Sequence, residues 1–237
     1  MMIKSIIFWV FLGVHTILWA SSGILLSLFA KNDKIIHFYI AVPWSRIILW
    51  FSNVRVKIRN LDRIDKNQSC IYIPNHLSFF DIFSLLAYLP VNFKFILKKE
   101  LMRLPVFGWA VKRAGYISID RSSPSKARYT FKQAVKMIQS GSSIVIFAEG
   151  TRSKDGTLQP LKKGAFQLAI ASGSPIVPIA IKGSNTILKK GDFKVKSGVI
   201  NMQVGQPILT TGYTAKSISE LIEKVTVSLR EMLEEKD

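Results

Sequence analysis

The sequence predicts an α/β protein with a mixed, largely parallel sheet flanked by helices on both faces, preceded by an N-terminal membrane-associated helical segment. Two observations indicate this class. From residue 54 onward, short runs rich in β-branched residues alternate with helical stretches, the pattern of strands joined by crossover helices. Apolar residues make up 49% of the 237 residues, and much of the excess lies in the first fifty. We therefore expect membrane-associated helices over residues 1–53 and one globular domain over residues 54–237.

The first apolar run extends from Ser5 to Ala30 without a formal charge and is flanked by Lys4 and Lys31. As a helix it would reach about 39 Å, enough for a hydrocarbon core of roughly 30 Å. A cleaved secretory signal is the alternative, because a cluster of small residues lies at 20–23. The apolar run continues beyond this cluster, which favours a retained membrane helix.

The second apolar segment, from Ile35 to Phe51, combines aromatic side chains with Pro43 and Arg46. This interrupted, amphipathic pattern is typical of a helix that lies in the membrane interface rather than one that crosses the bilayer. An inserted helical hairpin and a single span followed by a surface helix both remain open.

The remaining chain carries the periodicity of seven strands and five helices. The expected strands are Val54–Arg59, Cys70–Pro74, Phe93–Leu97, Tyr116–Asp120, Ile144–Ala148, Ile176–Ile181 and Val199–Val204. The expected helices are Phe80–Leu89, Pro105–Ala114, Pro124–Gln139, Lys162–Ala171 and Lys216–Glu234. The Lys- and Gly-rich segment Thr186–Gly198 has no apolar periodicity and is expected to be a mobile loop.

The formal net charge of +18 and the isoelectric point near 10.1 indicate an anionic partner, either nucleic acid or a phospholipid surface. Residues 1–53 carry four cations against Asp33, so most of the excess lies in the globular part. The sequence has no RNA-recognition aromatic pattern, finger spacing or basic-zipper heptad. We therefore expect membrane phospholipid, and no nucleic acid, as the partner.

Common site signatures are absent from this sequence. It contains no Gly-x-Ser-x-Gly, no Walker loop, no Gly-x-Gly-x-x-Gly and no His-Glu-x-x-His. Cys70 is the only cysteine, and its place in an apolar run favours burial over a reactive thiol. We expect no metal site and no bound cofactor. The remaining candidates for functional residues are polar residues that follow predicted strands.

The segment from Ile73 to Asp81 follows one of these strands and reads Ile-Pro-Asn-His-Leu-Ser-Phe-Phe-Asp. On a continuous helix, His76 and Asp81 would lie about 140° apart around the axis. If His76 instead lies in the turn and Asp81 in the first helical turn, the carboxylate can reach the imidazole. It would then fix the ring tautomer and leave the other nitrogen to take a proton from an alcohol. Ser78, two residues from His76, is a weaker candidate, as a nucleophile.

Three further blocks follow this segment in order, and they carry a resemblance. They are Gly-Tyr-Ile-Ser-Ile-Asp-Arg at 115–121, Phe-Ala-Glu-Gly-Thr-Arg-Ser at 147–153 and Ile-Val-Pro-Ile-Ala at 176–180. With Asn-His-x-x-x-x-Asp, the set resembles the phospholipid and glycerol-phosphate acyltransferase family over roughly Val54 to Gly205. The departures are slight. Ala148 stands where the family often has a proline, and Tyr116 to Ser118 differ from its usual Phe and Ile.

The resemblance implies that His76 and Asp81 are catalytic and that the second and third blocks bind the glycerol phosphate of an acceptor. The residues expected at the phosphate are Arg121, Glu149, Gly150, Thr151, Arg152 and Lys98. From the residues alone, Gly150 permits a tight turn and Arg152 can hold a phosphate bidentately. Glu149 is better suited to organising its loop by hydrogen bonds. For Arg121 and Lys98, an ion pair or a solvated charge remains the alternative.

The activity that the resemblance implies is transfer of a fatty acyl group to the free hydroxyl of 1-acylglycerol 3-phosphate (lysophosphatidate), giving phosphatidate. The expected donor is acyl-coenzyme A or acyl-carrier protein. Glycerol 3-phosphate or another lysophospholipid is the alternative acceptor. A non-catalytic basic module that binds lipid surfaces is the alternative from another class, although it would not need His76 with Asp81. We expect location at the inner membrane, with the domain on its cytosolic side.

Overall fold

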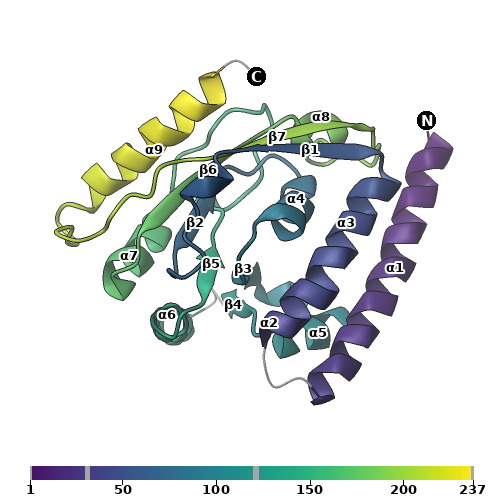
Figure 1. Ribbon diagram of the computed structural model, residues 1–237, viewed down its shortest axis with the longest axis horizontal. Helices are drawn as coiled ribbons and strands as arrows, with labels where there is room; N and C mark the ends of the chain where they lie inside the picture. Colours follow the sequence, from purple (N-terminus) through teal and green to yellow (C-terminus); the bar gives the residue numbers. More distant parts are fainter. Residues whose placement is uncertain (1, 30–32, 120–122, 236–237) are drawn as a thin grey trace.

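The computed structural model of the chain describes residues 2–29, 33–119 and 123–235. Figure 1 shows a twisted sheet at the centre with helices on both of its faces, and a helical pair at one side. The strands are β1 (Val54–Arg59), β2 (Ile71–Pro74), β3 (Phe93–Lys98), β4 (Ile117–Ile119), β5 (Ser143–Val145), β6 (Ile176–Lys182) and β7 (Gly198–Val204). The longer helices of the domain are α4 (Phe80–Tyr88), α5 (Phe107–Arg113), α6 (Pro124–Gln139), α7 (Lys163–Ser172) and α9 (Ile218–Glu234).

The seven strands lie in the order β1-β7-β6-β2-β5-β3-β4. Every neighbouring pair is parallel except β6 and β7, which are antiparallel. The predicted fold class, a mixed and largely parallel sheet, is confirmed. Since β2, β5 and β3 are adjacent and parallel, their carboxyl ends meet at one edge of the sheet.

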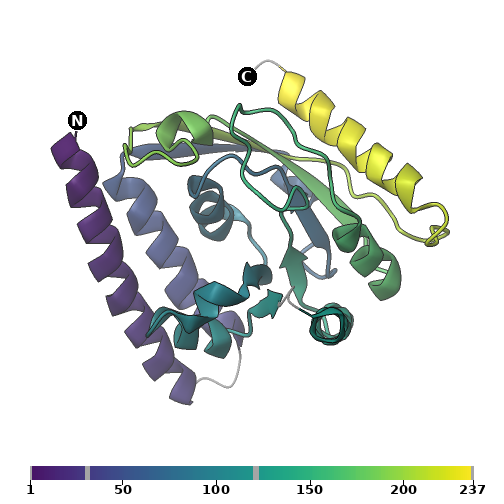
Figure 2. The ribbon, with the colours of Figure 1, turned by 180° about the vertical axis from the view of Figure 1, so that it is seen from behind.

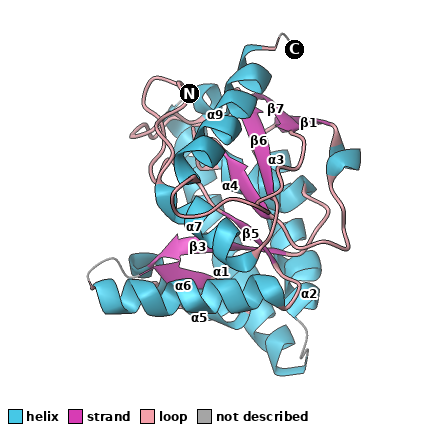
Figure 3. Ribbon diagram, turned by 90° about the vertical axis from the view of Figure 1, so that its left-hand side faces the viewer, coloured by secondary structure: helices cyan, strands magenta, loops and turns pink. Residues whose placement is uncertain are grey.

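Two apolar cores lie on the two faces of the sheet, because successive side chains of a strand point to opposite faces. In β2, Tyr72 belongs to the core beneath α3 and α4, whereas Ile71 and Ile73 belong to the core beneath α6, α7 and α9. All three side chains are fully buried. Figure 3 shows helices on both sides of the magenta strands.

Residues 2–29 and 33–51 form a pair of helical segments that lie side by side. α1 (Met2–Phe29) is followed by α2 (Asp33–Ile36), a π-helical turn η1 (His37–Ala41) and α3 (Val42–Phe51), and Figure 2 shows α1 beside α3. Among the described residues, α1 alone is long and apolar enough to cross a membrane. One side of α1 packs on the domain, because Phe8 stacks on Phe80 at a centroid distance of 5.9 Å. The predicted apolar helix is confirmed, and it lies along the domain.

Several predicted bounds differ from the structure. The strand predicted as Ile144–Ala148 ends at Val145, because Phe147 turns away and stacks on His76. The helix predicted to start at Pro105 starts at Phe107, after the short 3-10 helix η3 (Lys99–Arg103). Two more short helices, η2 (Leu61–Arg63) and α8 (Ser184–Ile187), were not predicted.

The segment 186–198, expected to be mobile, is attached to other elements. Leu188 accepts a hydrogen bond from the Ser78 hydroxyl at 2.8 Å. Trp9 donates its indole N–H to the Phe193 carbonyl at 2.9 Å, and the Val195 N–H donates to the Ser5 hydroxyl at 3.1 Å. The loop therefore joins α1 to the segment that contains His76.

Candidate active site

The candidate site lies at the edge where β2 and β5 end. His76 follows Pro74, the last residue of β2, by two positions, and Glu149 to Arg152 follow β5 by a short turn. The two strands are parallel neighbours, with Tyr72 opposite Val145. The sheet therefore brings together two sequence blocks that are more than seventy residues apart.

His76 and Asp81 form a hydrogen-bonded pair. The Nδ1 atom of His76 lies 2.9 Å from the Asp81 Oδ2 atom. His76 occupies the turn, and Asp81 is the second residue of α4, so a separation of five residues still permits contact. A carboxylate at Nδ1 favours the tautomer that carries its proton there, which leaves Nε2 as the acceptor. The pair can therefore take a proton from an alcohol at Nε2.

Asp81 is held in place by backbone groups as well as by His76. Its Oδ2 atom accepts the N–H groups of Leu77 at 2.7 Å and Ser78 at 2.8 Å. The side chain is fully buried, and its Oδ1 atom has no hydrogen-bond partner. Three donors on one oxygen fix the carboxylate while they compensate for its burial.

Glu149 organises the loop around His76. Its Oε1 atom accepts the His76 N–H at 2.6 Å, and its Oε2 atom accepts the Gln159 N–H at 3.0 Å. The Ser153 N–H donates to the His76 carbonyl at 2.8 Å, so the His76 backbone is held on both sides. Burial raises the pKa of Glu149 to about 7, although both backbone donors act to lower it. Glu149 thus faces the protein rather than an open site.

Two further residues position the His76 segment, and neither was assigned a role from the sequence. The Phe147 ring stacks on the His76 imidazole at a centroid distance of 3.8 Å. Asn75 is buried and exchanges two hydrogen bonds with the backbone of Ile181, at 2.7 and 2.9 Å. This amide clamp joins the end of β2 to β6. The sequence feature that could have indicated this contact is an asparagine directly after the last residue of a buried strand.

Arg152 lies over the ring of Phe79, with its guanidinium carbon 4.0 Å from the ring centroid. Phe79 immediately precedes α4, so this cation–π contact connects the loop after β5 to the start of the helix that carries Asp81. Burial lowers the pKa of Arg152, whereas the Asp81 charge raises it. The Arg152 guanidinium is therefore close enough to Asp81 for the two charges to interact.

The loop between Glu149 and Arg152 has a conformation that only glycine adopts easily. Gly150 has φ of +75°, and a Cβ atom there would lie 2.7 Å from the Lys162 Nζ atom. Lys190 donates to the Thr151 hydroxyl at 2.9 Å and to the Arg152 carbonyl at 2.5 Å. Lys190 was missed from the sequence, since it lies in the loop expected to be mobile and no spacing relates it to this block.

The two remaining residues expected at the phosphate are Lys98 and Arg121. Lys98 is the last residue of β3, which pairs with β5, and its backbone lies at the same edge of the sheet. Arg121 lies outside the described residues.

The alternative nucleophiles are buried. Ser78 is fully buried and donates its hydroxyl to Leu188, and Cys70 is only 3% exposed. Burial also raises the pKa of Cys70 to about 11, which keeps its thiol protonated at neutral pH. Within the described ranges no group of three or more His, Cys, Asp or Glu could hold a metal ion.

The fold and the site define an α/β protein with a preformed His–Asp pair at the carboxyl edge of its sheet. The sequence model of the family described as Acyltransferase matches residues 55–182. This match covers more than half of the chain, and the protein therefore belongs to the acyltransferase family.

Individual relatives agree with this assignment. A Brassica napus protein named 1-acyl-sn-glycerol-3-phosphate acyltransferase BAT2, chloroplastic, is 35% identical over 175 residues, which are 73% of this chain and 49% of that protein. The chain thus spans about half the length of this plant relative. A Pseudomonas aeruginosa protein named 1-acyl-sn-glycerol-3-phosphate acyltransferase is 27% identical over 238 residues, covering 98% of this chain and 91% of that protein.

A solved structure shares the fold over nearly the whole chain. It is the crystal structure of the 1-acyl-sn-glycerophosphate (LPA) acyltransferase PlsC from Thermotoga maritima. The TM-score is 0.84 at 20% sequence identity, and the match covers 98% of this chain and 95% of the other. At this identity the similarity establishes the fold, including the N-terminal helical pair.

Proposed function

We propose that the protein is a 1-acylglycerol-3-phosphate O-acyltransferase that transfers a fatty acyl group from a thioester to the free hydroxyl of lysophosphatidate. The observation that carries this proposal is the His76–Asp81 pair, with one imidazole nitrogen bound to a buried carboxylate and the other left to accept a proton. Membership of the acyltransferase family and the names of the relatives support the choice of acceptor.

The proposed reaction proceeds without a covalent intermediate on the protein. The Nε2 atom of His76 takes the proton of the acceptor hydroxyl as the oxygen attacks the thioester carbonyl carbon. The tetrahedral intermediate then collapses, the C–S bond breaks, and the imidazolium returns the proton to the leaving thiolate. The products are phosphatidate and a free thiol. A positioned general base of this kind contributes ~10²–10⁴-fold to the rate.

We propose that Arg152 and the loop formed by Glu149, Gly150 and Thr151 position the acceptor phosphate, together with Arg121 and Lys98. Arg152 can bind phosphate through two parallel N–H bonds. Glu149 contributes indirectly, because its carboxylate is engaged by backbone groups of the loop. Holding the acceptor by its phosphate would keep the hydroxyl near His76 and supply much of the remaining rate enhancement.

The donor in this proposal is acyl-coenzyme A or acyl-carrier protein, and the mechanism requires no resident cofactor or metal ion. Residues 1–53 serve as the membrane-associated part and residues 54–237 as the acyltransferase domain. We place the protein at the inner membrane with the domain on the cytosolic side, where both donors are soluble. The apolar α1 and the cationic excess of the domain support a membrane partner.

The test is a panel of acceptors offered to the purified protein with oleoyl-coenzyme A and with oleoyl-acyl-carrier protein. The panel contains 1-acylglycerol 3-phosphate, glycerol 3-phosphate and a neutral-headgroup lysophospholipid, and products are identified by mass. The proposal predicts phosphatidate as the main product. Preferential acylation of another acceptor would replace the substrate assignment, and absence of every product would favour a lipid-binding module.

A further inference from the structure

An exposed apolar surface lies on a part of the domain that the proposed reaction does not use. It is formed by η3 and α5, residues 99–113, which connect β3 to β4. Leu101, Leu104 and Trp109 are 38%, 49% and 68% exposed. Three large apolar side chains exposed within nine residues form a patch that water solvates poorly.

Cationic side chains accompany this patch. Arg103, Lys112 and Arg113 are exposed, and Glu100 is the single acidic residue of the segment. Tryptophan and leucine interleaved with lysine and arginine are typical of segments that lie in the interface of an anionic bilayer. The composition therefore favours a lipid surface over an apolar protein partner.

The segment has a defined, closely packed structure. Gly108 packs so closely on the backbone of Met102 that a Cβ atom would lie 2.2 Å from the Met102 carbonyl oxygen. The Gly108 N–H donates to the Leu104 carbonyl at 2.8 Å. η3 and α5 are therefore folded onto each other, which fixes the apolar side chains of both on one compact element.

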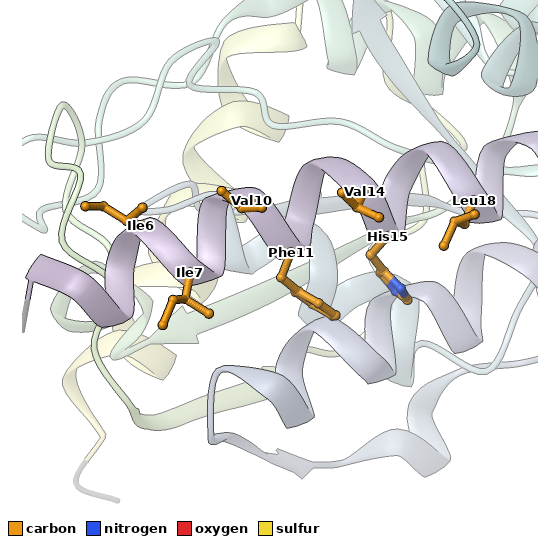
Figure 4. Close-up of a pocket in the computed structure, with 7 residues that line it drawn as sticks. All are labelled: Ile6, Ile7, Val10, Phe11, Val14, His15 and Leu18. Atoms are coloured by element: carbon orange, nitrogen blue, oxygen red, sulfur yellow. The ribbon is translucent and has the colours of Figure 1, made fainter.

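This segment lies next to α1. The outer side of α1 carries Val10, Val14 and Leu18, which are 62%, 55% and 62% exposed, and Figure 4 shows them on the helix. Their four-residue spacing places them on one face. α5 packs against α1, as Figures 1 and 2 also show. A bilayer that covers the outer face of α1 would therefore come within reach of the exposed side chains of α5.

We propose that η3 and α5 form a second membrane-binding surface, which contacts the interface of an anionic phospholipid bilayer beside α1. Leu104 and Trp109 enter the interface, and Arg103, Lys112 and Arg113 contact the headgroup phosphates. η3 follows β3, whose carboxyl end lies at the same edge of the sheet as His76. The second contact thus turns the candidate site towards the membrane, where a lysophospholipid can reach it without leaving the bilayer.

Cys70, the only cysteine of the chain, is buried and should label little in the folded protein. Cysteines introduced at exposed positions can therefore be labelled selectively. The variants Leu104→Cys and Trp109→Cys are each labelled with a fluorophore and reconstituted into vesicles of phosphatidylcholine and phosphatidylglycerol that contain nitroxide lipids. Val14→Cys is the membrane reference. Val227→Cys on α9 is the control, since it is 40% exposed and Figures 1 and 2 show α9 on the opposite side from α1.

The proposal predicts nitroxide quenching at positions 104 and 109 comparable to that at position 14, and little at position 227. Quenching at 109 should weaken in pure phosphatidylcholine, and also when Arg103, Lys112 and Arg113 are all replaced by glutamine. Quenching at 14 but not at 104 or 109 would overturn the second surface. Equal quenching at 109 in neutral and anionic vesicles would overturn the headgroup assignment. Neither quenching measurement requires acyl transfer, so a failure of this proposal can be distinguished from a failure of the proposed function.

Discussion

Replacing Asp81 by asparagine removes a charge from the pair while nearly preserving its shape. The three donors to the Oδ2 atom require an acceptor at that position, so we expect the asparagine oxygen there. The amide nitrogen then occupies the place of Oδ1, which has no partner in the structure. An unpaired buried donor costs about 1–3 kcal/mol of stability. The Asp81→Asn variant should therefore fold, although with a lower free energy of unfolding.

The expected loss of rate follows from the charge. When His76 accepts the hydroxyl proton, an imidazolium forms next to the Asp81 carboxylate, across the 2.9 Å hydrogen bond. Two unit charges about 4 Å apart attract by about 4 kcal/mol at an effective dielectric of about 20. Each 1.36 kcal/mol corresponds to about tenfold in rate, so kcat should fall ~10³-fold. The KM values should change little, because neither substrate is proposed to contact Asp81.

The assay is the initial rate of thiol release from oleoyl-coenzyme A in the presence of lysophosphatidate, at varied concentrations of each substrate. Asp65→Asn serves as a matched control, because Asp65 is exposed and accepts the Asn67 N–H at 2.8 Å within its own turn. A kcat within tenfold of wild type for Asp81→Asn would refute the electrostatic role of this carboxylate.

Three further predictions follow. Arg152→Ala should raise the acceptor KM ~10-fold or more, because a charge-assisted hydrogen bond contributes about 1.5–3 kcal/mol. The donor KM should stay within about threefold. A shift confined to the donor KM would contradict the proposed contact of Arg152 with the acceptor phosphate. Glu149, with its pKa raised from 4.5 to about 7, keeps a proton in the folded state that the unfolded chain loses. Its contribution to stability is therefore complete below pH 4.5 and is lost as the pH rises through about 7, and Glu149→Gln should flatten this slope in denaturant titrations. With a pKa of about 11, Cys70 should be ~10⁻³ thiolate at pH 8, so maleimide should modify it only after unfolding; rapid labelling of the folded protein would show that the strand is open.

The strands were largely predictable, because their β-branched runs are bounded by turn residues and separated by helical periods. The five helices of the domain were found for the same reason, α9 most clearly, since its buried residues recur every three or four positions. The short elements were not predictable. The four residues of α8 carry no periodicity, and the end of β5 depends on the stacking of Phe147 on His76.

Contacts in the candidate site were predictable from the sequence where the two residues are close in the chain, and they were not predictable where the residues are far apart. The His76–Asp81 contact needs only a turn followed by a helix start. By contrast, the partner of Asn75 lies 106 residues away, and Lys190 lies 38 residues from Arg152. Those contacts depend on strand order and on the path of a loop, which spacing does not encode.

The central claim is that His76 acts as the general base for direct acyl transfer to lysophosphatidate. The most direct measurement is the rate of phosphatidate formation, followed by mass, for wild type and His76→Ala in the same vesicles with oleoyl-coenzyme A as donor. We predict acceptor-dependent phosphatidate formation by wild type and a rate at least ~10²-fold lower for the variant. Equal rates of phosphatidate formation by the two proteins would contradict the account.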